Sequence, residues 1–282
     1  MLDNIKASRG RNIFLCMVSL LILLFLLFPI YWILVTSFKT EKEIFTIPPT
    51  LFPEIINTSS YTAQIQHGDF NMFQSFLNSF IISIGAMVIS VVFAVPASYG
   101  LAKFKFKGKK TMILGFLLTQ MLPVSVLLTP MFIMFKNFHL YNTPFAAILA
   151  DATIGIPFSV LILRNYFAAI PAEMEEAAYI DGCNRFSAFT RISMRIAKPG
   201  VIVCAIFSFL YAWGDLAYGM TFILDQQARP ITAGIFNFMG QYGTRWSYLT
   251  AYAIVTIIPV ILIFIFMQKY IVKGMTSGAV KG

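Results

Sequence analysis

Long stretches without a charged residue alternate with short polar segments along the whole chain. A helix crosses the apolar core of a bilayer with about 20 residues, and six stretches reach or approach this length. The fourth contains one acid, Asp151, and the fifth reaches full length only if it continues past Asp215. We therefore predict an all-α membrane protein, a single polytopic domain over residues 1–282 with six transmembrane helices. The expected spans are about 13–38, 76–102, 111–135, 143–163, 199–219 and 247–268.

The basic residues collect in alternate connections between these spans. Of the 21 Lys and Arg residues, 16 lie in the terminal segments and in the connections after spans two and four, and only 5 lie in the remaining connections. Because Lys and Arg are enriched on the cytoplasmic side of membrane proteins, both termini and the loop 164–198 are predicted to be cytoplasmic. The outer loops are then 39–75, 136–142 and 220–246.

The composition agrees with a membrane protein. Hydrophobic residues make up 58% of the chain and charged residues 12%, about half the charged share of a soluble domain. A net charge of +9 would suggest nucleic-acid binding in a soluble protein, but no polar domain carries it here. We attribute the charge to membrane orientation, and we interpret the Lys103–Lys110 cluster as a topology and lipid-headgroup anchor.

The sequence lacks the common signatures of catalysis and metal binding. The only Gly-Lys pair, Gly108-Lys109, has neither the upstream glycine nor the following Ser or Thr of a P-loop. His67 and His139 are far apart and belong to no HExxH motif. We therefore expect no catalytic residue, no metal and no cofactor in this chain. The absence of a CxxC pair also argues against a disulfide framework or a zinc site, although there are three cysteines, Cys16, Cys183 and Cys204.

Asp151 and Asp215 are the only acids expected at membrane depth. Ionisable residues inside a membrane usually mark a transport path or a reactive site, so both are candidate polar residues of a translocation path. Two further interpretations remain open. The carboxyls could meet as the pair of an intramembrane aspartyl protease, or they could make structural polar contacts near the outer interface.

The cytoplasmic loop 164–198 differs from the other connections. Pro171 suits the first turn of a helix, and Gly182 suits a C-terminal stop, so the spacing predicts a short helix between them. Met174, Ala177 and Ala178 fall on one small, apolar face flanked by glutamates. A helix that merely lies on the membrane surface would carry Lys and Arg on its polar face, and this one has none. We predict a docking element for a partner protein, followed by a second short amphipathic element containing Phe186 and Phe189.

The same loop carries a family resemblance. Glu176-Ala177-Ala178, then Gly182 and later Ile192 resemble the EAA loop of inner-membrane permease subunits of ABC importers. Nearly the whole chain is similar to the smaller, six-span permease of maltose-type systems in the carbohydrate-importer branch. The further matching segments are Ser98–Ala102, Ile156–Phe158, Gln268–Tyr270 and Gly274–Gly282.

The resemblance implies a function, partners and sites. It implies a permease subunit in the bacterial cytoplasmic membrane that moves sugars together with a second homologous permease and a solute-binding protein. Two ATP-binding subunits would hold the ATP and Mg. The implied docking residues are Glu176, Ala177, Ala178, Asp181 and Gly182, and the implied tail contacts with those subunits are Gly278 and Lys281.

Two positions depart from the family pattern. Met194-Arg195 replaces the usual Leu-Pro after the isoleucine, and Trp213-Gly214-Asp215-Leu216 lacks the amide that often precedes the acid. A stand-alone secondary transporter is the main alternative, but it would show inverted repeats and more intramembrane ionisable residues. Neither it nor the protease explains the EAA segment.

The tail contact gives a first test. Deleting Gly274–Gly282 is expected to lower transport-coupled ATPase activity in the assembled importer, because the tail would touch the ATP-binding subunits. Transport assays in membrane vesicles, with ATP hydrolysis measured in parallel, check this. Unchanged coupling after the deletion would rule the tail contact out.

Overall fold

The computed structural model describes residues 2–66, 71–240 and 243–279. Within these ranges the chain is mostly helical and has one two-stranded antiparallel sheet, in which Met239 pairs with Thr244. The chain forms two compact units. One contains residues 1–66 and 235–257, and the other contains 67–234 and 258–282. The last helix, α13 (Trp246–Ala279), contributes to both units.

The first unit is held together by polar contacts near the start of α13. One carboxylate oxygen of Glu41 accepts hydrogen bonds from the backbone N and the Oγ of Ser247, at 2.9 and 2.7 Å. The amide of Gln64 donates to the backbone oxygen of Tyr248 at 3.0 Å. Residues 39–66 of the predicted loop 39–75 are therefore structured rather than open. The elements of this unit besides α13 are α1 (Leu2–Ser37), α2 (Glu41–Ile44), α3 (Ser59–Gln66), η2 (Ile235–Phe238), β1 (Met239–Gly240) and β2 (Gly243–Thr244).

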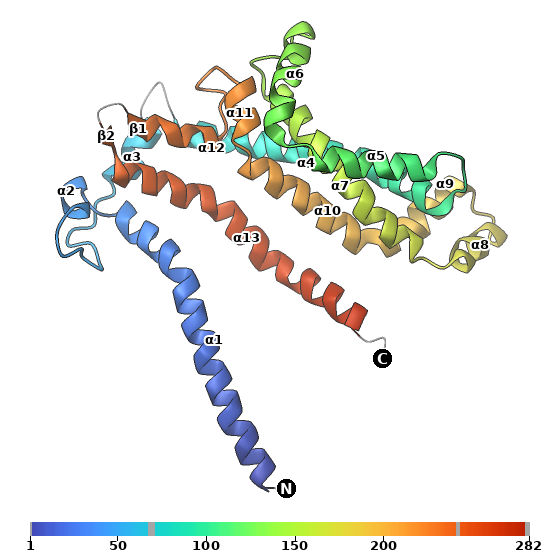
Figure 1. Ribbon diagram of the computed structural model, residues 1–282, viewed down its shortest axis with the longest axis horizontal. Helices are drawn as coiled ribbons and strands as arrows, with labels where there is room; N and C mark the ends of the chain where they lie inside the picture. The colour runs from blue at the N-terminus through green and yellow to red at the C-terminus, as the bar shows by residue number, and fades with distance from the viewer. Residues whose placement is uncertain (1, 67–70, 241–242, 280–282) are drawn as a thin grey trace. The chain divides into compact units, whose positions relative to one another are not determined.

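The second unit is built around three long helices, α4 (Met72–Lys103), α7 (Pro144–Ala168) and α10 (Met194–Gly214). These three contact one another more extensively than any other helices, and Figure 1 shows them running side by side. The remaining elements lie along or at the ends of these helices. They are α5 (Lys109–Met121), α6 (Val124–Asn137), α8 (Ala172–Ile180), α9 (Arg185–Ala188), η1 (Phe189–Ser193), α11 (Ala217–Phe222) and α12 (Ile231–Gly234).

Small residues let the three core helices approach closely. A Cβ added at Gly155 of α7 would lie 2.3 Å from the Oγ of Ser90 on α4 and 3.0 Å from the Oγ of Ser208 on α10. Lipid tails are as apolar as leucine, so helices in a membrane associate through close packing rather than through the hydrophobic effect. The crossing at Gly155 is therefore a point on which the packing of the second unit depends.

The third predicted span, 111–135, is not one continuous helix. It is divided into α5 and α6, whose axes differ in direction by 101°. Pro123 precedes α6 and Leu122 is extended, because proline disfavours a helical conformation in the residue before it and lacks an N–H of its own. The sequence contained this signal, but a count of uncharged residues does not detect it.

The fifth predicted span, 199–219, also differs from the helix in the structure. The helix stops at Gly214 instead of continuing past Asp215, and its additional length lies before residue 199. One oxygen of Asp215 accepts hydrogen bonds from the backbone N atoms of Tyr218 and Gly219, at 2.9 and 3.0 Å. Asp215 therefore lies between two helices: it follows the end of α10, and its carboxylate accepts from the first turn of the separate helix α11, which begins at Ala217.

The other four predicted spans each fall largely within one long helix, namely α1, α4, α7 or α13. In the described part of the chain, five helical segments are long and apolar enough to cross a membrane, or six if the bent pair α5 and α6 forms one span. The fold is thus a multi-helix membrane fold.

The packing at Gly155 predicts a stability effect. Gly155→Ala should lower the stability of the protein by about 1–3 kcal/mol, because the new methyl group overlaps Ser90 at a packed crossing. Gly115→Ala is the matched control, since no atom lies within 4 Å of a Cβ built there. Thermal unfolding of the two purified variants compares them. Equal melting temperatures would contradict the assignment of the crossing.

Candidate functional site

The helix predicted in the loop 164–198 forms as α8 (Ala172–Ile180), between Pro171 and Gly182. Its C-terminus is closed by two backbone hydrogen bonds, from Gly182 N to Tyr179 O at 3.1 Å and from Cys183 N to Ala178 O at 2.9 Å. This is the Schellman arrangement, which requires a left-handed residue just after the helix. Gly182 has φ +85° and supplies it, so the predicted stop is confirmed.

The faces of α8 differ from the prediction. Ala178 is buried, whereas Met174 and Ala177 are exposed, so these three residues do not form one apolar surface. The second buried residue of the helix is Glu175, the middle one of its three glutamates. Glu176 is exposed. The inner face therefore pairs a small residue with a charged one.

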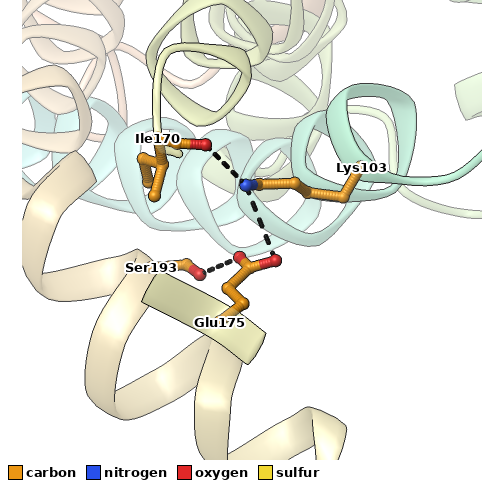
Figure 2. A network of polar contacts seen from close by, with 4 residues as sticks. All are labelled: Lys103, Ile170, Glu175 and Ser193. Atoms are coloured by element: carbon orange, nitrogen blue, oxygen red, sulfur yellow. Dashed lines mark hydrogen bonds and ion pairs between the residues drawn. The ribbon is translucent and has the colours of Figure 1, made fainter. Parts of the chain in front are cut away.

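Glu175 is the centre of a polar network that connects α8 to the membrane helices (Figure 2). One oxygen of its carboxylate lies 3.5 Å from the ammonium of Lys103, and the other accepts a hydrogen bond from the Oγ of Ser193. Lys103 also donates to the backbone oxygen of Ile170 at 2.8 Å. We call Lys103, Ile170, Glu175 and Ser193 the Glu175 network.

The members of the Glu175 network come from three helical elements and from the turn that follows α7. Lys103 is the last residue of α4, Ile170 follows the end of α7, and Ser193 ends η1, which continues into α10. The side chains of Lys103 and Glu175 are only 13% and 9% exposed. A buried, hydrogen-bonded ion pair of this kind fixes geometry, because removing either partner leaves a charge without compensation. α8 is therefore attached directly to the end of α4 and to the start of the α10 run, and to the chain after α7 only through Lys103.

Sequence reasoning missed the role of Glu175. Three closely spaced glutamates looked equivalent, and the acidic first turn was explained by the helix dipole alone. A usable signal was present, because Glu175 and Ala178 are three residues apart and so share one face of the helix. Only the folded chain brings Lys103 to that face.

The second amphipathic element is not a separate helix. α9, η1 and α10 form one uninterrupted helical run from Arg185 to Gly214. Met194-Arg195 contains no proline, so nothing stops the helix where the family usually has Leu-Pro. The ring centroid of Phe189 lies 4.6 Å from that of Tyr99 on α4, so Phe189 packs against the core helices. Phe186, in contrast, is 73% exposed.

The docking residues expected from the sequence lie together at one end of the second unit. Glu176, Ala177, Asp181 and Gly182 are exposed, whereas Ala178 is buried. Large apolar side chains are also exposed in this segment, which is unusual outside a membrane unless a partner covers them. They are Met174, Tyr179, Ile180 and Phe186.

The two candidate membrane acids have different environments. Asp151 on α7 is 2% exposed, and neither carboxylate oxygen has a hydrogen-bond partner among the described residues. Asp215 is used as the cap of α11. Within the described residues, no group of three or more His, Cys, Asp or Glu side chains is placed to hold a metal ion.

The predicted tail contacts fall at the edge of the described chain. Gly278 lies in the last turns of α13, and Lys281 lies outside the described residues.

Comparison with known proteins identifies the family. Residues 94–277 match the binding-protein-dependent transport system inner membrane component. The chain belongs to this family. The match includes α7, α8 and α10 and the whole Glu175 network. It confirms the resemblance to ABC-importer permeases, and it favours a membrane transport subunit over a stand-alone transporter or a protease.

Individual relatives and a solved structure agree with this family assignment. The diacetylchitobiose uptake system permease protein of Streptomyces coelicolor is 32% identical over 257 residues, which cover 91% of this chain and 92% of that relative. The trehalose transport system permease protein of Mycobacterium tuberculosis is 33% identical over 275 residues, covering 96% and 98%. A chain of a bacterial ABC transporter for import of the acidic polysaccharide alginate shares the fold, with a TM-score of 0.80, 21% identity and coverage of 94% and 97%.

The Glu175 network gives a prediction for this permease. Lys103→Met should destabilise the attachment of α8 by about 3–5 kcal/mol, because Glu175 stays buried without a counter-charge. Adding Glu175→Gln should restore part of the loss, so the two effects should not be additive. Limited proteolysis of the loop in the purified complex measures the attachment. Lys107→Met is the control, since Lys107 is exposed and has no ion-pair partner among the described residues.

Proposed function

We propose that this chain is the sugar-translocating permease subunit of a binding-protein-dependent ABC importer in the bacterial cytoplasmic membrane. The sugar class is supported by the relatives, which carry diacetylchitobiose, trehalose and arabinooligosaccharides by name. Its proposed partners are a second homologous permease, two ATP-binding subunits that hold ATP and Mg, and an extracytoplasmic solute-binding protein. The chain itself does no catalysis in this proposal.

One observation carries the proposal. α8 presents Glu176 and Ala177 outward, with Gly182 exposed just after its end, while Glu175 on its opposite face is bonded to Lys103 of α4 and to Ser193 before α10. Lys103 in turn donates to the backbone oxygen of Ile170 after α7. A surface that is open on one side and rigidly attached on the other can pass a displacement into the membrane helices. This is the property that a subunit driven by a separate ATPase needs.

The proposed mechanism is mechanical. Closure of the ATP-binding subunits displaces α8, and the Glu175 network moves the ends of the three core helices with it. This shifts the permease between states open to either side of the membrane. Reversing a population from 1:99 to 99:1 requires about 5.5 kcal/mol of differential interaction. A loose loop would absorb such a displacement, whereas a fixed helix transmits it.

The carboxyl of Asp151 is our candidate polar group for the translocation path. Its oxygens have no hydrogen-bond partner in the described chain, although it lies inside the helix core. Asp215 is the weaker candidate, because its carboxylate already caps α11.

The docking residues provide the test. Glu176→Gln and Gly182→Val should each reduce the ATPase activity that loaded binding protein stimulates, the first by removing an exposed charge and the second by straining a left-handed position. Proteoliposomes that contain the complete transporter allow ATP hydrolysis and sugar uptake to be measured together.

Gly100→Ala serves as the control for the glycine change, since Gly100 is helical and no atom lies within 4 Å of a Cβ built there. If both docking variants assemble normally and keep full stimulation, α8 is not the docking surface and the proposal is wrong.

A further inference from the structure

A basic pocket lies beside the start of α5, separate from the Glu175 network. Its volume is about 510 Å³. Four cationic side chains line it, one from the connection between α4 and α5, two from the first turn of α5 and one from α7. Two apolar side chains complete most of the wall. These six residues are Lys105, Lys109, Lys110 and Arg164, with Phe106 and Ile113.

The charge of this pocket is not neutralised within the described chain. None of its four cations has a carboxylate partner there, because the one ion pair of the described residues joins Lys103 and Glu175. Lys109 has a long hydrogen bond, 3.4 Å, to the backbone oxygen of Phe104. The Nε of Arg164 is buried and has no hydrogen-bond partner. Like charges held this close raise the local potential and favour a bound anion.

The backbone adds to this preference. α5 starts after Gly108, which has φ +88° and provides no side-chain cap. The first N–H groups of a helix have no partner within it, and the positive end of the helix dipole lies there. Gly108, Lys109 and Lys110 all border the pocket. An anionic group in this position would therefore receive backbone as well as side-chain donors.

The location and the apolar wall indicate what kind of anion fits. The pocket lies where the charged connection gives way to the uncharged stretch 111–135, on the side that the Lys and Arg distribution assigns to the cytoplasm. A ligand with a charged head and an apolar tail would use both the cations and the side chains of Phe106 and Ile113. A free phosphate ion would use only the cations.

We propose that this pocket binds the phosphate headgroup of an anionic phospholipid from the cytoplasmic leaflet, with Lys109, Lys110 and Arg164 as the cationic donors. Basic pockets between membrane helices on this side are suited to such headgroups. The site is independent of the sugar and of α8, so it goes beyond the proposed transport function. It gives the Lys103–Lys110 cluster a specific ligand site in addition to its effect on orientation.

The test uses the complete transporter in nanodiscs of phosphatidylcholine, with or without added phosphatidylglycerol. Native mass spectrometry counts the lipids that stay bound after release from the disc. The unmodified protein should retain phosphatidylglycerol in preference to phosphatidylcholine, and Lys109→Gln with Lys110→Gln should reduce this retention several-fold. Arg164→Gln should act in the same direction.

Arg191→Gln with Arg195→Gln is the matched control. It removes the same amount of charge from two exposed residues of the loop 164–198. This loop is predicted to lie on the same side of the membrane as the pocket, but neither arginine lines the pocket. Retention of phosphatidylglycerol should stay at the unmodified level. An equal loss in the control and the pocket variants would mean that general surface charge attracts the lipid, and would overturn the proposal.

Two further outcomes would also overturn it. If inorganic phosphate in phosphatidylcholine discs raises the melting temperature as much as phosphatidylglycerol does, with the same dependence on Lys109 and Lys110, the pocket is a phosphate site without a lipid tail. If the pocket variants keep their bound lipid but lose the ATP-binding subunits, the pocket holds a protein partner. Failure of sugar transport alone does not affect this test, because its readout is bound lipid.

Discussion

The carboxylate of Glu175 holds the end of the second unit together. Without it, α8 would lose its ion pair with Lys103 and its hydrogen bond with Ser193. With it, the last residue of α4 and the residue just before α10 share one anionic partner, and the same lysine donates a hydrogen bond to the backbone oxygen of Ile170 after α7. An ion pair shielded from water is less affected by salt than one on the surface. The attachment of α8 therefore depends on an interaction that salt in the surrounding solution weakens little.

The membrane explains why so much of the chain lacks a protein partner. None of the apolar window in α1 is buried inside the structure, whereas 61% of the window in α7 is. In water, an exposed apolar helix such as α1 would be a defect, but in lipid it is already solvated. Only helices that carry small or polar residues at their crossings, such as Gly155 and Ser90, need partners within the chain.

Local signals in the sequence were sufficient for the long helices and for α8. Uncharged length located α1, α4, α7 and α13, and Pro171 with Gly182 marked the ends of α8 because both residues restrict the backbone directly. Local sequence signals could not predict the role of a side chain whose partner is distant in the sequence. Asp215 looked like part of a span but caps a helix, and Glu175 could not be told from Glu176 until Lys103 was placed.

The π-helical turn η1, between α9 and α10, has a consequence for how this protein can change. Such a turn holds one residue more than an α-helical path over the same length. One residue rotates a helix by about 100°, because 3.6 residues complete a turn. The exposed face of α9 is therefore out of phase with the face that α10 packs against α4 and α7. Gain or loss of a single residue here would rotate the exposed face of α9 while the packing of α10 kept its register.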